Sequence, residues 1–548
     1  MKRVLIHATV AVALLAGLLV SGPAWAWGPR AVQSISAMAL QMLKQDYPDT
    51  FRPGGVVGPN FEKDVVTGAR DGVAALGGTV PLGNEKEVMQ AVATEVLLLR
   101  EARQYGPTSY FAYRMGVLGA LTANVMLPFG FAWTPEDLDI QQRMMADIEK
   151  HLDGYGFSPT SHRREFIRDG YVYFLNKRAF HEQDKALIRN DYKRGTGYEG
   201  FLKQGGRAYF TRAVETVADV WNTVLNSEMD GVATLVKPSD RALTWYFVNE
   251  MEYLMRVKSN MHQAERVYEN FEKVNPRLVE AYVKVGDIFY NFNTAESRLR
   301  GIEEWRKAYA LGGPERAGIG KKLSAHYLAE GRAFLEKAGL PGATETDLNS
   351  ALNAFEQALD YDRTSETAAS LIQETNLAIV ARNERLEMAI NIISTGEKVR
   401  AEADNFRERQ DYANAIKTYR QAIGFFEAVD DEFKEQSDTA KENVRRLQKS
   451  IKDVITDVLD AASAAIDEGD RAKDGNRFDE ANGAYDRVAA IVSVIPEDEK
   501  ENILQDKNSM IEMAAKKKEE ANVAKIRYEQ AMAEQAAAAA AQQQGGAR

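Results

Sequence analysis

The chain has 548 residues, more than one hydrophobic core usually serves, so its length predicts at least two structural units. Hydrophobic residues make up 45% and charged residues 27% of the sequence, a balance typical of globular proteins. The formal net charge of −11 argues against nucleic acid as a partner. The sequence has no cysteine, which excludes disulfide bonds, thiolate metal sites and thiol nucleophiles.

The first 26 residues have the pattern of a signal peptide. Lys2 and Arg3 form a basic head, an apolar run follows, and Ala24 and Ala26 are small residues that a signal peptidase accepts. We therefore expect a mature chain that starts at Trp27 and is exported, to the periplasm or outside the cell. Loss of the two basic residues takes the formal charge from −11 to −13. Beyond this run no stretch is apolar enough to predict a membrane span.

Residues 27–240 are rich in aromatic residues, glycine and proline, with helical stretches separated by loops. Ile35, Ala39 and Met42 recur at helical spacing and predict an amphipathic helix. The segment from Phe111 to Leu127 is the most apolar of the mature chain and predicts a helix buried on nearly all sides. The front of the chain is thus expected to form a helical domain.

Residues 241–500 repeat one short pattern: a small residue, an aromatic residue four positions later, and a small or apolar residue three positions further on. The copies are Ala264/Tyr268/Phe271, Gly301/Trp305/Ala308, Ala351/Phe355/Ala358, Ala415/Tyr419/Ala422 and Ala481/Tyr485/Val488. Upstream of four copies a small residue stands where a partner helix would touch, at Gly286, Gly331, Ala403 and Gly469. Small residues at such positions let two helices pack closely.

This pattern resembles the tetratricopeptide repeat (TPR), a helix–turn–helix unit of about 34 residues that stacks into an α-solenoid. The resemblance implies a groove that holds a protein partner. A generic helical bundle with an alanine and aromatic core is the alternative, and both interpretations predict an all-α protein. Residues 501–548 predict a charged helix, in which Lys516 to Glu520 form a solvated face, followed by a disordered Ala/Gln-rich tail.

The predicted mature start, Trp27-Gly28-Pro29-Arg30-Ala31-Val32, resembles the opening of the zinc-dependent phospholipase C and S1/P1 nuclease superfamily. In that family the terminal tryptophan ligates zinc through its free amine and carbonyl, and a histidine follows at the position of Val32. Valine cannot bind zinc. The resemblance therefore concerns the scaffold of a helical phospholipase C-like domain over residues 27–240.

The other metal-ligand positions of the family are also replaced in this sequence. Aligning its His-x3-Asp-x5-His helix on Pro128 puts Ala120, Asn124 and Gly130 at the three ligand positions. The Gly-Pro-Asn sequence ending at Asn60 stands where the family has an aspartate, and only Glu165 retains a ligand type from a later His-x3-Glu. A zinc site needs several N and O ligands that converge on the ion.

We therefore expect no catalytic residues, no metal and no cofactor. The leading hypothesis is an exported scaffold whose TPR-like groove holds a protein partner, with a peripheral lipid contact left open. The alternative is a zinc-dependent phosphodiester hydrolase, a phospholipase C or nuclease, with a rearranged metal site. Its ligands would come from Asp64, Asp71, His162, Glu165 and His181. A third hypothesis is a structural protein of the cell envelope.

Overall fold

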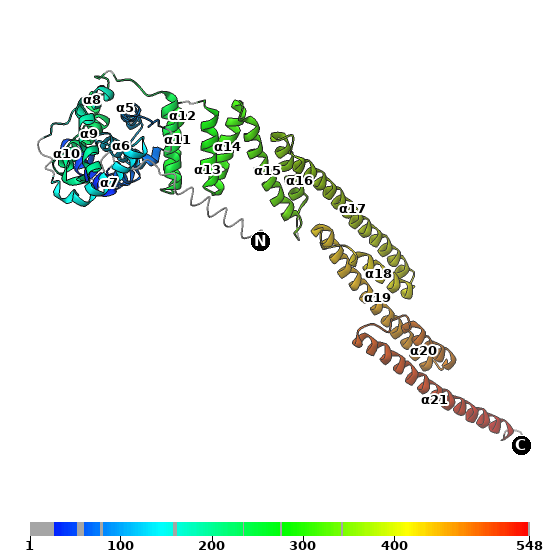
Figure 1. Cartoon of the computed structure of the whole chain (residues 1–548). Coiled ribbons are helices and arrows are strands. Elements are labelled where there is room, and N and C mark those ends of the chain that lie inside the picture. Colours follow the sequence, from blue (N-terminus) through cyan, green and yellow to red (C-terminus); the bar gives the residue numbers. More distant parts are fainter. Residues whose placement is uncertain are drawn as a thin grey trace, which may run out of the picture. The chain divides into compact units, whose positions relative to one another are not determined.

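A computed structural model describes residues 27–51, 60–76, 80–156, 162–233, 235–274, 277–340 and 343–545. Every regular element in these ranges is a helix, which confirms the all-α fold class (Figure 1). The chain divides into two compact units, the first ending at Leu323 and the second beginning at Ser324. None of the helices in the described ranges has the length and apolar character needed to cross a membrane. The predicted signal peptide lies outside the described residues.

The first unit contains α2 (Pro29–Asp46), α3 (Pro48–Phe51), α4 (Phe61–Asp71), η1 (Gly72–Leu76), α5 (Glu85–Arg103), α6 (Ser109–Val125), α7 (Pro135–His151), η2 (Leu152–Gly154), α8 (Gly170–Lys177), α9 (His181–Arg194), η3 (Gly197–Glu199), α10 (Phe201–Leu225), η4 (Ser227–Met229), α11 (Asp240–Arg256), α12 (Met261–Val274), α13 (Val279–Asn291) and α14 (Ala295–Leu311). Helix α15 (Arg316–Ala338) runs across the division between the units.

Helix α6 is the centre of the first unit, as its apolar sequence predicts. Nearly all of its side chains are buried, and it packs against α2, α4, α5 and α10. Two glycines allow α4 and α6 to meet backbone to backbone: a Cβ on Gly68 would lie 1.8 Å from the carbonyl oxygen of Tyr113, and a Cβ on Gly116 would lie 1.9 Å from that of Val65. A larger residue at either position would force the two helices apart.

The first unit extends beyond the front domain that the sequence predicts. The ring of Tyr110 on α6 lies 5.3 Å from that of Tyr246 and 5.4 Å from that of Tyr253, both on α11. The ammonium group of Lys258 lies 2.6 Å from a carboxylate oxygen of Asp64 on α4. Helices that the sequence pattern assigns to the repeats thus pack directly on the front helices, and the predicted boundary near residue 240 lies inside this unit.

A buried carboxyl group stands at this junction between α6 and α11. Glu250 on α11 is 3% exposed and accepts a hydrogen bond from the hydroxyl of Thr108. The same hydroxyl caps α6 by accepting from the backbone N–H groups of Tyr110 and Phe111, at 3.1 and 3.3 Å. Burial raises the pKa of Glu250 to about 8, because the hydrogen bond from Thr108 only partly offsets the lost hydration of the carboxylate.

The second unit alternates long and short helices. It contains α16 (Glu345–Tyr361), α17 (Glu366–Glu408), α18 (Tyr412–Glu427), α19 (Lys434–Asp474), α20 (Phe478–Val492) and α21 (Glu501–Gly545). Residues 66 positions apart in the α17–α18 and α19–α20 hairpins have the same structure. Gln410 and Asn476 both end a long helix in the left-handed conformation, with φ of 61° and 60°. The hydroxyls of Tyr419 and Tyr485 donate to the aspartate fifteen positions earlier, Asp404 and Asp470.

Close packing at a small residue recurs in the hairpins of both units. A Cβ on Gly469 would lie 2.5 Å from the ring of Tyr485 in the next helix, and the matching distance from Gly331 to Phe355 is 2.4 Å. In the first unit a Cβ on Gly286 would lie 2.3 Å from Trp305. An aromatic ring of the second helix therefore fills a notch that the small residue leaves in the first, where the sequence pattern predicts close packing.

Helix α21 differs from the sequence prediction in two respects. It continues through the Ala/Gln-rich segment as far as Gly545, where the sequence predicts a disordered tail, because alanine has the highest helix propensity. The lysine run is only partly a solvated face. Lys517 pairs with Asp470 on α19, and Lys518 lies 2.6 Å from Asp486 on α20.

Replacing Gly469 by valine tests the notch in the second unit. Because the Cβ would overlap the ring of Tyr485, we expect the second unit to lose about 1–3 kcal/mol of stability, the usual range for overpacking. Gly483→Ala is the matched control, since nothing lies within 4 Å of its Cβ and alanine favours a helix. Circular dichroism during urea unfolding measures the loss. Equal stability of Gly469→Val and the wild type would contradict the notch.

Replacing Glu250 by glutamine tests the buried carboxyl. The folded-state pKa of about 8 is above the unfolded value of 4.5, so the folded state holds the proton more tightly. Stability should therefore fall as pH rises from 4.5 to 8, by about 1.4 kcal/mol per pH unit, and Glu250→Gln should remove this dependence.

Indole fluorescence is the readout for this experiment. The tryptophans that follow the predicted signal peptide lie between Trp27 and Trp305, so their fluorescence reports the first unit alone. Parallel stability–pH curves for the wild type and the Glu250→Gln variant would show that Glu250 ionises normally.

Candidate functional site

The structure buries several of the positions at which the phospholipase C-like resemblance places metal ligands. Trp27 is fully buried, and its indole N–H donates to the carbonyl of Ala123 on α6 at 2.8 Å. Val32 on α2 and Ala120 on α6 are core residues, 2% and 0% exposed. These side chains pack α2 and the residues before it on α6, and valine and alanine have no side-chain donor atom for a metal.

Asn124 and Gly130 lie together, at the wall of a small cavity that His181 also lines. Its volume of about 10 Å³ holds roughly one water molecule. The carbonyl oxygen of the Asn124 side chain is buried, and no described residue donates a hydrogen bond to it. A Cβ on Gly130 would lie 1.7 Å from the backbone oxygen of Asn124, so a histidine at this position would require a different backbone.

The remaining predicted positions lie elsewhere in the first unit. Asn60 is exposed and precedes α4, and Glu165 lies in the extended segment before α8. The ligands of the alternative zinc site do not converge either: Asp64 pairs with Lys258, and Asp71 accepts from the hydroxyl of Tyr113 at 3.2 Å. Within the described ranges no three His, Asp or Glu side chains are grouped so that they could hold a metal ion.

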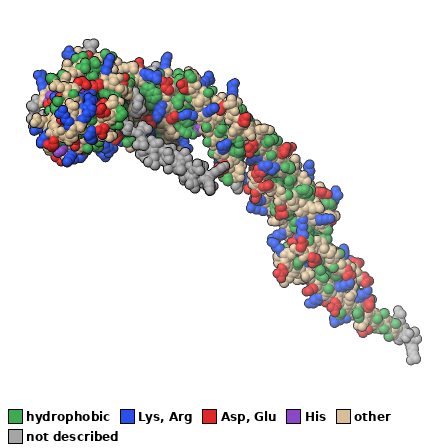
Figure 2. Space-filling model, in the orientation of Figure 1, with side chains coloured by type: hydrophobic (Ala, Val, Ile, Leu, Met, Phe, Trp, Pro, Cys, Tyr) green, Lys and Arg blue, Asp and Glu red, His purple; other side chains and the backbone are tan. Residues whose placement is uncertain are grey.

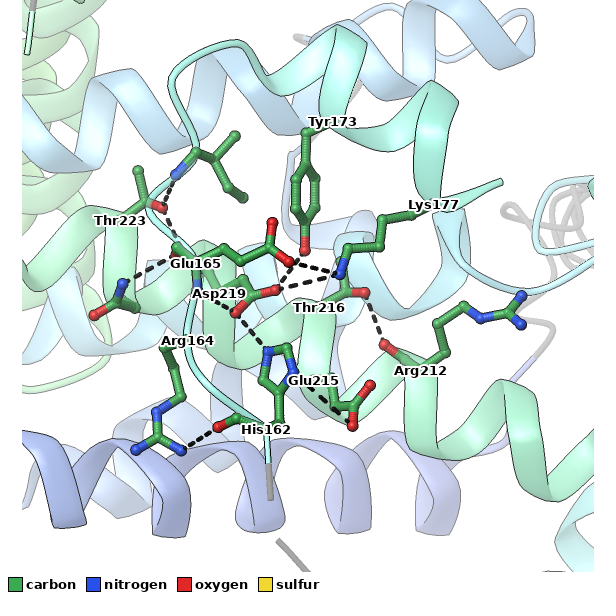
Figure 3. A network of polar contacts seen from close by, with 12 residues as sticks. His162, Arg164, Glu165, Tyr173, Lys177, Arg212, Glu215, Thr216, Asp219 and Thr223 are labelled. Carbon is green, nitrogen blue, oxygen red and sulfur yellow. Dashed lines mark hydrogen bonds and ion pairs between the residues drawn. The ribbon is translucent and has the colours of Figure 1, made fainter. Parts of the chain in front are cut away.

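The structure instead joins His162 and Glu165 around a carboxylate that the sequence analysis missed. Asp219 on α10 is fully buried, and one of its oxygens lies 2.7 Å from His162 Nε2 and accepts from the backbone N–H of Glu165 at 2.8 Å (Figure 3). Its other oxygen accepts from the hydroxyl of Tyr173 at 2.6 Å and lies 3.8 Å from the ammonium group of Lys177. Asp219 is thus the centre of a polar network.

One signal in the sequence indicates this network. Asp219 interrupts an apolar stretch of α10, with Val217, Ala218, Val220 and Trp221 around it. A charged side chain in a buried helix needs several polar partners, because its hydration is lost on folding. The sequence alone does not identify those partners, which belong to the segment before α8 and to α8 itself, more than 40 residues away.

The network fastens an extended segment to the side chains of α10. Asp219 accepts from the N–H of Glu165, and Asn222 donates to the carbonyl of the same residue at 3.0 Å. Two residues further, the N–H of Ile167 donates to the hydroxyl of Thr223 at 2.9 Å. Polar side chains of a helix therefore satisfy the backbone groups of this segment, as a neighbouring strand would in a sheet.

His162 and His181 have opposite electrostatic environments. The hydrogen bond to Asp219 raises the pKa of His162 and more than offsets the effect of burial, and Glu215 lies 4.0 Å from its other ring nitrogen. Burial, together with the nearby cations Arg178 and Lys185, lowers the pKa of His181 to about 2. His162 is thus held in its charged form more readily than His181, which stays neutral.

Both ring nitrogens of His162 face carboxylates. In a Ser–His–Asp triad the second ring nitrogen faces a nucleophile, whereas here it faces the carboxylate of Glu215. Figure 3 also draws the hydroxyl groups of Thr216 and Thr223, and both donate to backbone carbonyls. Thr216 donates to the carbonyl of Arg212 at 2.7 Å, and Thr223 donates to that of Asp219 at 2.8 Å. The network holds the segment of His162 and Glu165 on α10, and among the residues drawn no hydroxyl faces the second ring nitrogen of His162.

The chain matches no family model, no curated protein and no solved structure. The phospholipase C-like and TPR-like interpretations therefore remain predictions that rest on the sequence.

Asp219→Asn and His162→Gln test the network. The asparagine variant loses the ion pair with His162. Its amide NH2 group also cannot accept a hydrogen bond, so one donor of this buried site is left without an acceptor. We expect the first unit to lose about 2–4 kcal/mol of stability. The stabilisation that His162 gives through its raised pKa should be complete below pH 6.5 and disappear as pH rises through the folded pKa.

The difference in stability between the wild type and His162→Gln should therefore be larger at pH 5.5 than at pH 9, measured by indole fluorescence in urea. Asp153→Asn is the control, because its ion pair with Arg30 is exposed and should be worth less than about 1 kcal/mol. A pH-independent difference for His162→Gln would contradict the pairing with Asp219.

Proposed function

We propose that this protein is an exported scaffold whose helical repeats bind a protein partner and whose front domain carries no catalytic metal. The observation that carries the proposal is the recurring hairpin in which an aromatic ring fills the notch at a small residue, at Gly286, Gly331 and Gly469. Stacked helical hairpins of this kind expose long helical surfaces to a partner, and none of their contacts requires catalysis.

The residues at the metal-ligand positions suggested by the sequence resemblance support the proposal. Buried valine, alanine and glycine stand at three of them, and a Cβ at Gly130 would overlap the backbone. The hydrolase alternative depends on a zinc-bound water as nucleophile. Its proposed ligands, among them Asp64, Asp71 and His181, have separate neighbours in the structure.

The exposed surface of the second unit also supports binding of a protein. Large apolar side chains there are open to solvent: Leu377 is 63% exposed, Ile526 is 55% exposed and Phe425 is 38% exposed. Figure 2 shows such hydrophobic side chains among charged ones on the surface of this unit. Apolar contacts rimmed by charge are typical of protein interfaces.

Site-specific photo-crosslinking tests the proposal. A benzophenone amino acid is placed at Leu377, Phe425 or Ile526 in the second unit, and at Phe180 or Val257 in the first unit as controls, since both are also exposed. We expect one protein to crosslink from positions in the second unit, and the purified pair to bind in solution. Crosslinks only from the first unit, or none at all, would contradict a repeat-mediated scaffold.

Elemental analysis of the same purified chain, starting at Trp27, separates the two hypotheses. The scaffold hypothesis expects a folded protein without stoichiometric zinc after dialysis against trace zinc. Two or three tightly held zinc ions, together with hydrolysis of phospholipid or nucleic acid, would establish the hydrolase instead.

A further inference from the structure

We propose that α17 binds a cationic amphipathic helix of the partner protein. The surface is an acidic stripe made of Leu377, Val380, Glu384, Glu387 and Met388. This inference rests on the proposed function and names the chemistry of the partner. At 100° per residue these five side chains fall within one narrow arc of the helix, because their spacing of 3, 7, 10 and 11 residues follows its period.

The acidic stripe has no partner in the described part of the second unit. Leu377, Val380 and Met388 are 63%, 54% and 55% exposed. The helix packs through another face, on which small residues recur at intervals of seven or fourteen: Ala368, Thr375, Ala389, Gly396 and Ala403. Three large apolar side chains of α17 are thus exposed to solvent, while the helix packs on its neighbours through a different face.

The charges around the stripe are unbalanced. Arg382 and Arg385, the cations of this part of α17, both pair with Glu432, the latter through nitrogens 2.8 and 2.9 Å from its carboxylate oxygens. Glu384 and Glu387 are exposed and make no ion pair with any described residue. Lys398, the next cation on this side, lies ten residues beyond Met388, almost three helical turns away.

This chemistry selects one kind of occupant. An amphipathic helix carries its apolar residues along one face, and this face can lie along Leu377, Val380 and Met388, which are spaced by three and eight residues on one face of α17. Lysine or arginine at its edges would pair with Glu384 and Glu387, whereas an anionic membrane or a nucleic acid would be repelled by them. The formal charge of −11 on the whole chain favours approach of the same kind of partner.

A synthetic helix of leucine and lysine, about five turns long, is the probe. Its binding to the full chain is measured by fluorescence anisotropy at low and high salt, beside a peptide in which glutamate replaces lysine. We expect the basic peptide to bind, the acidic one not to bind, and salt to weaken binding. Glu384→Lys/Glu387→Lys and Leu377→Gln/Met388→Gln should each weaken it by about tenfold or more.

Matched controls come from another face of the same helix. Ile390 is 50% exposed and Glu397 is exposed, so Ile390→Gln and Glu397→Lys make the same types of substitution outside the stripe, and each is compared with the single substitutions Met388→Gln and Glu384→Lys within it. Binding by these controls should stay within twofold of the wild type, and circular dichroism should show all variants folded. No binding of the basic peptide, or equal losses in stripe and control variants, would overturn the inference.

The crosslinking experiment distinguishes this inference from the proposed function. A partner that crosslinks from Phe425 or Ile526 while the stripe variants bind it normally would leave the scaffold standing and reject the acidic stripe. Absence of crosslinks from the whole second unit would reject both. A crosslinked partner whose contact segment is acidic would also reject the stripe.

Discussion

The structure depends on helices that approach one another at backbone distance. A chain without cysteine has no covalent bridges, so packing must hold its helices. Glycine makes the closest contacts, between α4 and α6 through Gly68 and Gly116, and under an aromatic ring at Gly286 and Gly469. Each contact buries apolar surface at native density, which gives both stability and a defined helix register.

Near the start of the chain, polar side chains of α10 hold a segment without regular secondary structure in place. The segment around Glu165 is neither helix nor strand, and its backbone groups need partners once buried. Asp219, Asn222 and Thr223 on α10 supply them, and His162 and Tyr173 complete the hydrogen bonding of the buried carboxylate. At Val32 and Ala120, where the sequence resemblance places metal ligands, the structure has buried apolar side chains, and at Glu165 it has this hydrogen-bonded segment.

Much of the fold could be predicted from the sequence, because helix periodicity and small-residue spacing are local properties. The burial of α6 and the close packing at Gly286 and Gly469 follow from such patterns. The Asp219 network could not be predicted, since it joins α10 to α8 and to the segment before it through contacts distant in sequence. The packing of Tyr253 on Tyr110 was missed for the same reason, as was the pairing of Lys517 with Asp470.

The duplication in the second unit makes the chain modular. Residues 409–474 run from the end of α17 to the end of α19, and position 475 is equivalent to position 409. Deleting or duplicating residues 409–474 would leave each helical hairpin with a left-handed turn and with a tyrosine that donates to an aspartate. This unit can therefore be lengthened or shortened by one helical hairpin at a time, because each hairpin contains its own turn and its own Tyr–Asp hydrogen bond.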